Sequence, residues 1–311
     1  MIDPSAIEVP VALFVYRRCA PLHRTLDCLR ASGAGRLYVF SDAAAGPEAQ
    51  DDVAAVRALV AAIDWTDTIV VERPRNLGLS ASIRDGLDSV FAAHESVMVI
   101  EDDVCVAPEF CRYAQAALDA YRDEPRVAGV TGLRYPFARD ALERYPYDVF
   151  MSPRFSSWGW ASWRDRWASF SFDGVALRNA LAERGAELQA ARAGADMPWL
   201  IENAIVRESL GGSWDVACAA NMLLRDQWFV TPAWNMVENS GIVEGTHGSR
   251  RAPGWRLEWE TERRPADLGS MRFPPAAEEP GVLRDYRAFF EPGLRQRAVA
   301  ALSGLRRRRS R

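Results

Sequence analysis

Short apolar runs alternate with amphipathic stretches along the first half of the chain. The runs have the length of buried strands and predict strands at 9–16, 36–40, 68–72 and 97–100. The stretches that follow them carry apolar side chains on one face and predict helices at 21–31, 50–63, 80–94 and 109–122. Ser80 or Ser82 is expected to cap the third helix. Because strands that alternate with helices are typical of βαβ units, we predict an α/β fold with a doubly wound, mostly parallel sheet.

The pattern changes after Val127, where turn residues interrupt the alternation. Aromatic side chains crowd residues 155–163, which indicates a segment that faces a substrate. An alanine-rich covering helix is expected from Gly174 to about Ala193, and an apolar helix over 214–224. Beyond residue 250 there is little periodicity before 298–305.

Composition narrows the class of protein. At 311 residues and 49% hydrophobic side chains, the chain can bury one large core. A net charge of −4 without a basic stripe argues against nucleic acid as a partner. The five cysteines have no C-x-x-C spacing, so we expect reduced thiols and a cytoplasmic protein. The first residues, Met1 to Pro4, carry no basic region, and no apolar run reaches the roughly 18 residues that span a bilayer, so we expect a protein that is neither exported nor integral to a membrane.

Three consecutive acids, Glu101, Asp102 and Asp103, follow the predicted strand at 97–100. They fall at the carboxyl end of that strand, where open α/β sheets bind ligands. Adjacent negative charges repel one another, and hard oxygen ligands suit Mg²⁺ or Mn²⁺, which complete their shells with water and phosphates. The cluster therefore predicts a metal–diphosphate site, with a solvated acidic turn as the alternative.

Glycine-rich phosphate cradles are absent from the sequence. Neither G-x-x-x-x-G-K-[ST] nor G-x-G-x-x-G follows a predicted strand, and the chain contains no lysine. Metal and arginine are therefore the expected partners of a diphosphate.

Several ordered motifs carry a resemblance to a known family. They are E-D-D-x-x-x-[AS]-P-x-F at 101–110, F-x-x-x-G-W at 155–160, W-D at 214–215, N-x-G-L at 76–79 and G-T-H at 245–247. Together they resemble the GT-A nucleotide-sugar glycosyltransferases, in particular bacterial relatives of N-acetylglucosaminyltransferase I, over roughly residues 9–248.

The resemblance implies a separate role for each acid. Asp103 would ligate Mn²⁺ or Mg²⁺ at the diphosphate, Asp102 would contact the ribose, and Glu101 would bind donor-sugar hydroxyls. It also implies a GT-A domain over 1–250, with a nucleotide-binding half (1–127) and an acceptor and catalytic half (128–250). Residues 251–311 would form a wrapping or mobile tail.

The W-D match implies that Asp215 is the general base of an inverting transfer. Such a base takes the proton of the acceptor hydroxyl as its oxygen attacks the anomeric carbon. Trp214 could form an apolar wall against a sugar. The alternative is that Asp215 caps the helix over 214–224, since Asp is a common cap.

Arg18 and Asp42 follow the first and second predicted strands, at the same edge as the acids. The resemblance implies that both contact the uracil base, although the register could instead select Arg17. The alternative is a surface arginine and a turn aspartate. Arg84, on the helix after the N-x-G-L loop, could reach the diphosphate or lie exposed.

Trp158 is expected in the sugar pocket, because aromatic faces pack against pyranose C–H groups. Trp163 and Trp167 are expected in the core. His247 lies between glycines that let a ligand approach closely, and it could complete the metal shell, touch the diphosphate or lie exposed.

The resemblance thus implies a metal-dependent inverting glycosyltransferase. Its expected donor is a UDP-linked nucleotide-diphosphate sugar, with UDP-GlcNAc as one candidate. Its acceptor would be a saccharide or lipid-linked glycan of a bacterial surface or secreted polymer. The arginine-rich end over 294–311 would contact an anionic membrane or remain a solvated tail. Two alternatives remain open, a catalytically silent sugar-nucleotide-binding or scaffold protein and a metal-dependent sugar-nucleotide phosphohydrolase.

Overall fold

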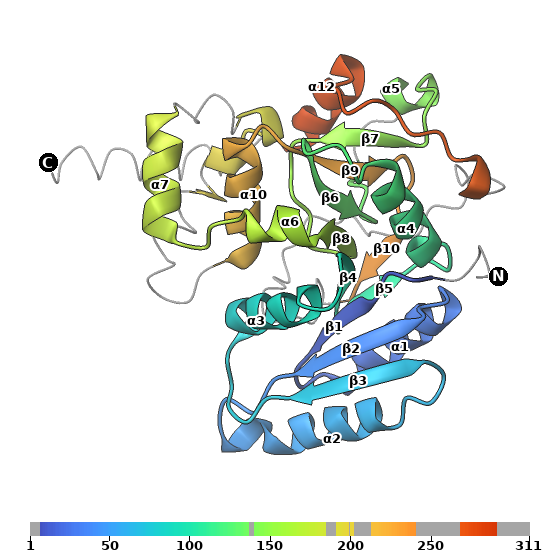
Figure 1. Cartoon of the computed structure of the whole chain (residues 1–311), viewed down its shortest axis with the longest axis vertical. Helices are drawn as coiled ribbons and strands as arrows, with labels where there is room; N and C mark the ends of the chain where they lie inside the picture. The colour runs from blue at the N-terminus through green and yellow to red at the C-terminus, as the bar shows by residue number, and fades with distance from the viewer. Residues whose placement is uncertain are drawn as a thin grey trace, which may run out of the picture.

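An eight-stranded mixed sheet organises the chain (Figure 1). The computed structural model describes residues 7–136, 140–184, 191–198, 200–201, 213–240 and 268–290. In spatial order the strands are β3 (Asp67–Glu72), β2 (Arg36–Ser41), β1 (Val11–Val15), β4 (Ser96–Glu101), β8 (Trp160–Trp163), β6 (Val127–Thr131), β9 (Trp228–Pro232) and β7 (Val149–Ser152). The predicted α/β fold with a mostly parallel sheet is confirmed: only β8 and β7 run against the other strands.

The first four strands match the predicted apolar runs within one or two residues at each end. β1 and the central residues of β4 are fully apolar and buried, as expected of strands covered on both faces. β1 pairs with β2 on one side and with β4 on the other, so the chain reverses its direction of winding between β1 and β4. Ligands bind at such a switch point in open α/β sheets.

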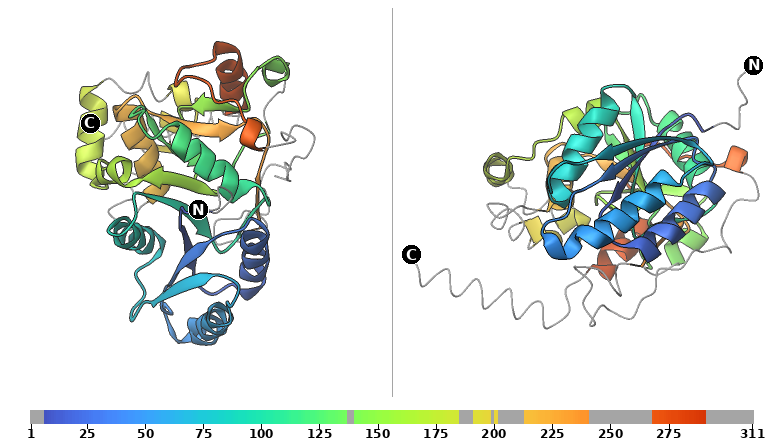
Figure 2. Two further views of the ribbon diagram at one scale, coloured as in Figure 1. Left: turned by 45° about the vertical axis from the view of Figure 1, so that its right-hand side comes forward. Right: turned by 90° about the horizontal axis from the view of Figure 1, so that it is seen from below.

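Helices cover both faces of the sheet (Figures 1 and 2). The helices over one face are α1 (Cys19–Ala31), α2 (Gln50–Ala61), α4 (Phe110–Ala120), the short α5 (Asp140–Glu143) and α12 (Pro280–Phe289). The helices over the other face are α3 (Leu79–Phe91), α6 (Arg164–Ala168), α7 (Gly174–Glu183) and α10 (Trp214–Leu224). Each group buries its apolar side chains in its own cluster against the sheet.

A small second sheet lies beside the acid cluster. β5 (Val104–Val106) pairs with β10 (Val237–Asn239) in antiparallel register, with Val104 opposite Asn239. The backbone N–H of Ser240 donates to the Asp103 carbonyl at 3.0 Å. The chain that follows the acids is thereby held against β10 and Ser240.

Two boundaries differ from the sequence-based expectation. Gly78, not Ser80 or Ser82, is the N-cap of α3, because its φ of 75° is a left-handed conformation that glycine adopts without strain. The alanine-rich helix is described only to Glu183, and residues 185–190 lie outside the described part.

Part of the predicted tail packs against the body. Val282, Leu283 and Tyr286 of α12 are buried in the first cluster, and the Tyr121 hydroxyl donates to the Pro274 carbonyl at 2.6 Å. The region over 298–305 and the arginine-rich end lie outside the described residues. Among the helices that are described, none is both long and apolar enough to cross a membrane. All five cysteines are free thiols.

Candidate functional site

The carboxyl ends of β2, β1 and β4 bring the predicted polar residues to one edge of the sheet. Arg18 begins the turn from β1 into α1, Asp42 follows β2, and Glu101 ends β4. Because these strands are parallel neighbours, residues distant in the sequence meet at this edge.

Arg18 forms ion pairs with two of the three acids. Its guanidinium contacts Asp102 and lies 2.9 Å from the Asp103 carboxylate. Arg17 instead is exposed, with its guanidinium 5.8 Å from the centre of the Tyr16 ring. The structure therefore selects Arg18 over Arg17 as the arginine that faces the acids.

The acid cluster is electrostatically crowded. Burial, and then the charges of Asp103, Asp102 and Asp215, raise the pKa of Glu101 to about 8. Burial also raises the pKa of Asp102 to about 6, although Arg18 opposes this shift. One guanidinium thus faces several carboxylates, and a further cation would be attracted to this edge.

The carboxylate oxygens of the acid cluster suit a divalent cation that takes most of its ligands from a substrate. Among the described residues there is no group of three or more His, Cys, Asp or Glu side chains that could hold a metal by themselves. Mg²⁺ and Mn²⁺ commonly use one or two carboxylates together with phosphates and water. Asp103, whose side chain is 13% exposed, is the more accessible of the two aspartates, since that of Asp102 is only 5% exposed. His247 lies outside the described residues.

Asp42 holds a loop in place. Its carboxylate accepts backbone hydrogen bonds from Ala43, Leu77 and Gly78, each at 2.9 Å. The Asn76 amide completes the connection by donating to the Ala43 carbonyl at 2.7 Å. Asp42 therefore ties the end of β2 to the entrance of α3, which agrees with the turn aspartate that the sequence left as the alternative to contact with the uracil base. The N-x-G-L match lay at the right place but gave no partner for the acid.

Asp215 is the second residue of α10. Ser213 is the N-cap of this helix, so the alternative in which Asp215 caps it is wrong. Asp215 lies within electrostatic reach of Glu101, and it forms part of the wall of a cavity. The helix thus brings one carboxylate from the second half of the chain towards the acid cluster of the first.

The cavity has a volume of about 200 Å³. Its polar wall residues are Tyr135, Arg154, Ser156, Ser157 and Asp215. Its apolar wall residues are Phe155, Trp158, Met197, Leu200, Val216 and Ala219. The predicted sugar-pocket residue Trp158 and the predicted base Asp215 therefore share one cavity.

Trp214 packs in the core and is not among the cavity-lining residues. It is 4% exposed and stacks on Trp160, with ring centres 5.8 Å apart. The ring of Phe155 is nearly perpendicular to that of Trp214, with ring centres 5.6 Å apart. Trp163 and Trp167 are buried, as expected. The position of Trp214 indicates that it anchors the start of α10, whereas its predicted contact with a sugar stays a prediction.

Arg84 is exposed on α3, where its guanidinium lies 5.0 Å from the centre of the Phe172 ring. Its predicted contact with the diphosphate also stays a prediction.

Arg154 and Asp196 were not found from the sequence. The Arg154 guanidinium donates to both carboxylate oxygens of Asp196, at 2.9 and 3.0 Å, and to the Ala193 carbonyl at 3.2 Å. It also lies 3.9 Å from the centre of the Phe290 ring. This buried arginine joins the cavity wall to residues 191–198 and to the end of α12. No local sequence motif predicts such a long-range pairing.

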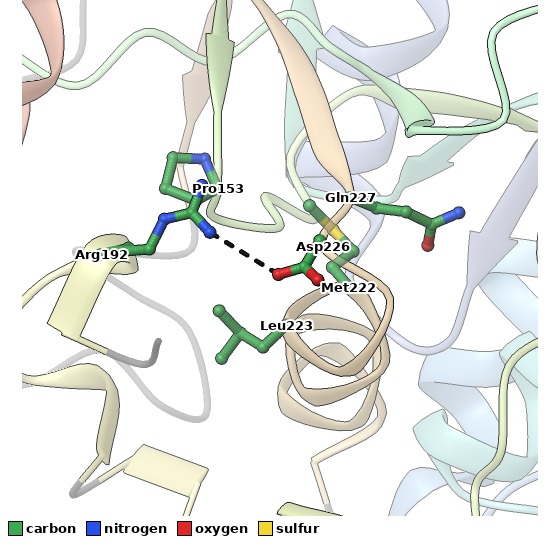
Figure 3. Close-up of a pocket in the computed structure, with 6 residues that line it drawn as sticks. All are labelled: Pro153, Arg192, Met222, Leu223, Asp226 and Gln227. Carbon is green, nitrogen blue, oxygen red and sulfur yellow. Dashed lines mark ion pairs between the residues drawn. The ribbon is translucent and has the colours of Figure 1, made fainter. Parts of the chain in front are cut away.

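A second hollow is too small for a substrate. It measures about 10 Å³ and lies between Pro153, Arg192 and the end of α10 (Figure 3). Arg192 and Asp226 form an ion pair across it at 3.6 Å. A volume of this size holds about one water molecule.

The fold and site define an α/β protein with an acid cluster at the carboxyl edge of its sheet. No protein-family model and no curated protein sequence matches the chain. The mannosyltransferase PcManGT from Pyrobaculum calidifontis, solved in complex with GDP-Man and Mn²⁺, aligns with a TM-score of 0.39 and 16% identity, over 71% of this chain and 75% of that chain.

Two further solved structures align less well. HddC from Yersinia pseudotuberculosis has a TM-score of 0.30 and 10% identity, over 50% of this chain and 77% of that one. The 4-diphosphocytidyl-2C-methyl-D-erythritol synthase from Anaerococcus prevotii has a TM-score of 0.32 and 11% identity, over 52% and 74%. Likenesses at this level do not define a family, so function is argued from the site.

Proposed function

We propose that the protein is a metal-dependent inverting glycosyltransferase of GT-A type that uses a nucleotide-diphosphate sugar. One observation carries this proposal. Three acids and Arg18 gather at the switch point of the sheet, and Asp215, from the opposite half of the chain, lies within electrostatic reach of Glu101. A diphosphate site and a separate carboxylate for proton transfer are the two parts that such a reaction needs.

The acid cluster is the proposed donor end. Asp103 would hold Mn²⁺ or Mg²⁺, which supplies charge neutralisation at the departing diphosphate. Asp102 is proposed to contact the ribose, and Glu101 the hydroxyls of the donor sugar. Arg18 supplies a fixed positive charge beside them, at the edge where the base of a UDP-linked donor is proposed to bind.

Asp215 is the proposed general base. In an inverting transfer a single carboxylate takes the proton of the attacking hydroxyl as the bond to the leaving diphosphate breaks on the opposite side of the sugar. Its place in the wall of the cavity gives an acceptor hydroxyl a route to the carboxylate. The proposed acceptor is a saccharide or lipid-linked glycan.

A thermal-shift screen tests the proposal. Nucleoside diphosphates and their sugars are added to the full chain with Mn²⁺ or with EDTA, because a ligand that binds the folded state raises the melting temperature. We expect a shift with UDP or a UDP-sugar that requires Mn²⁺. No shift with any nucleotide would overturn the donor site. Nucleotide binding without transfer to any saccharide would favour a sugar-nucleotide-binding protein, and diphosphate release that is indifferent to acceptor would favour a phosphohydrolase.

A further inference from the structure

Two of the five free thiols lie together close to the acid cluster. Cys28, on α1, and Cys105, on β5, share a side-chain hydrogen bond although they are far apart in the sequence. Thiols are weak hydrogen-bonding groups, so this contact contributes little stability by itself. Its importance is proximity, because a disulfide forms only between cysteines that the fold already brings close to each other.

Two further contacts fix the face of α1 that carries Cys28. The Thr25 hydroxyl donates to the Asp102 carbonyl at 3.0 Å. Arg24 forms an ion pair at 3.1 Å with Glu238, the residue of β10 that lies opposite the second cysteine. Residues three or four positions apart share one face of a helix, so Arg24, Thr25 and Cys28 all lie on the face that packs against β5. The meeting of the two thiols therefore follows from the packing of two well-fixed elements.

The two thiols differ in their access to solvent. Cys28 is half-buried, whereas Cys105 is only 5% exposed. A small reagent from solvent therefore meets Cys28 first, and Cys105 lies behind it within reach of the same sulfur. An accessible thiol backed by a second thiol is the arrangement in which oxidation proceeds to a disulfide.

We propose that Cys28 and Cys105 are a redox-sensitive dithiol that closes to a reversible disulfide between α1 and β5, with a low-molecular-weight disulfide as the oxidant. The Cys28 sulfur attacks the small disulfide, whose S–S bond breaks, and one small thiol leaves a mixed disulfide on the protein. The Cys105 sulfur then attacks the Cys28 sulfur and releases the second small thiol. The cysteines are oxidised, the small disulfide is reduced, and the two protons lost by the protein end on the two small thiols.

The cross-link acts on the acid cluster, a consequence that rests on the proposed function. Helix α1 begins directly after Arg18, and β5 begins directly after Asp103. The Arg18 guanidinium lies 2.9 Å from the Asp103 carboxylate, so a cation that binds there has to displace this ion pair. A disulfide that ties α1 to β5 disfavours the arrangement in which Arg18 has moved away. The oxidised protein should therefore bind a nucleotide with Mn²⁺ less tightly than the reduced protein.

Peptide mapping by mass spectrometry tests the disulfide. The native full chain is incubated with glutathione disulfide and quenched with acid, and free thiols are then blocked in denaturant before digestion without reductant. We expect a cross-linked peptide pair that contains Cys28 and Cys105 and is absent after treatment with dithiothreitol. A glutathione adduct on Cys28 without the cross-link, or no oxidation of either cysteine in the native protein, overturns the dithiol.

Two variants of α1 supply a matched comparison. Cys28 and Cys19 are both half-buried on this helix. Cys28→Ser should abolish the cross-link to Cys105, whereas Cys19→Ser should leave it unchanged. Reduced forms that melt like reduced wild type show that both variants fold. A cross-link between Cys105 and another cysteine in wild type overturns Cys28 as the partner.

Thermal shifts with UDP and Mn²⁺ separate this inference from the proposed function. Each shift is measured from the melting temperature of the same form without ligand. We expect a smaller shift for oxidised than for reduced wild type, and equal shifts for Cys28→Ser before and after oxidation. Equal shifts in oxidised and reduced wild type overturn the control of nucleotide binding and leave the disulfide. A mapped disulfide in a protein that shows no nucleotide shift in either form overturns the glycosyltransferase and leaves the dithiol.

Discussion

Glu101 and Asp215 come from opposite halves of the chain, and their carboxyls interact in the folded protein. Burial, followed by the charges of Asp103, Asp102 and Asp215, raises the pKa of Glu101 to about 8. Glu101 is the last residue of β4 and Asp215 the second residue of α10, so these two elements bring the carboxyls within reach of each other. A donor end and an acceptor end can therefore share one reaction centre, and the predictions below separate their contributions.

Replacing Asp103 with Asn should remove the metal-dependent part of nucleotide binding. At a ligand concentration of 100 times the dissociation constant, binding stabilises the wild-type protein by about 2.7 kcal/mol, and this gain should be lost. Thermal shifts with UDP, in Mn²⁺ and in EDTA, measure it. Asp67→Asn, on the exposed edge strand β3, is the control and should behave as wild type. An Mn²⁺-dependent shift that persists in Asp103→Asn would exclude Asp103 as the metal ligand.

Replacing Asp215 with Asn should remove transfer and leave donor binding intact. General-base catalysis contributes about 10²–10⁴-fold, so turnover should fall by that factor. Release of UDP in the presence of an acceptor is the measurement. Asp226→Asn, just beyond the other end of α10, is the matched control, since Asn tolerates the φ of 52° found there. Normal turnover in Asp215→Asn would show that another group accepts the proton.

Replacing Asp42 with Ala should destabilise the protein. Three backbone N–H groups, of Ala43, Leu77 and Gly78, lose their acceptor. One fully buried unsatisfied donor costs about 1–3 kcal/mol, and because these three donors are only partly buried we expect the free energy of unfolding to fall by about 1–3 kcal/mol in total. Urea denaturation measures the loss, and Asp42→Asn, which retains one acceptor oxygen, should lose less. If Asp42→Ala has the same free energy of unfolding as wild type but binds nucleotide poorly, Asp42 contacts the uracil base and does not stabilise the loop.

The Arg154–Asp196 pair should show strong energetic coupling. Asp196→Ala leaves a buried guanidinium without its carboxylate, which costs about 3–5 kcal/mol when a pair is fully buried. Because the Asp196 side chain is 24% exposed, we expect a loss nearer about 2 kcal/mol. The double variant Arg154→Met, Asp196→Leu should be more stable than Asp196→Ala. Additive losses in chemical denaturation would mean that the two side chains contribute independently.

The cysteines should react with iodoacetamide in an order set by burial. Burial raises the pKa of Cys111 to about 11, although the hydrogen bond between Cys111 and Ser32 opposes the shift. At pH 8 this thiol is protonated and covered, so alkylation should require unfolding. Cys19, half-buried at the start of α1, should react in the native protein. Mass spectrometry of the labelled peptides gives the order, and rapid native labelling of Cys111 would contradict the packing of α4.

The sequence was most informative where local pattern decides structure. The strands from β1 to β4 and the bounds of α10 follow from apolar runs, because each element buries side chains at a fixed period. The grouping of Arg18 with the three acids follows from strand order alone. Gly78 was missed as the cap of α3, since its left-handed backbone is fixed by Asp42 from the end of β2 and not by its own neighbours.

Tertiary partners explain what local pattern did not reveal. Arg154 lies just after β7 and pairs with Asp196, which is 42 positions further along the chain. Nothing in the residues next to either one specifies the other. Trp214 was expected as an apolar wall against a sugar, and its stack on Trp160 in the core could not be predicted from its neighbours in the sequence.

The antiparallel strand β8 limits where the protein chain can be shortened. β8 lies between β4 and β6 and pairs with both, so the two halves of the chain form one continuous sheet. A fragment that ends near residue 127 would expose the apolar edge of β4, and the complementary fragment would expose that of β8. Unprotected edges of this kind promote aggregation. Shortened versions intended for crystallisation or expression should therefore be trimmed at the termini, because a division between the halves would open the sheet at its centre.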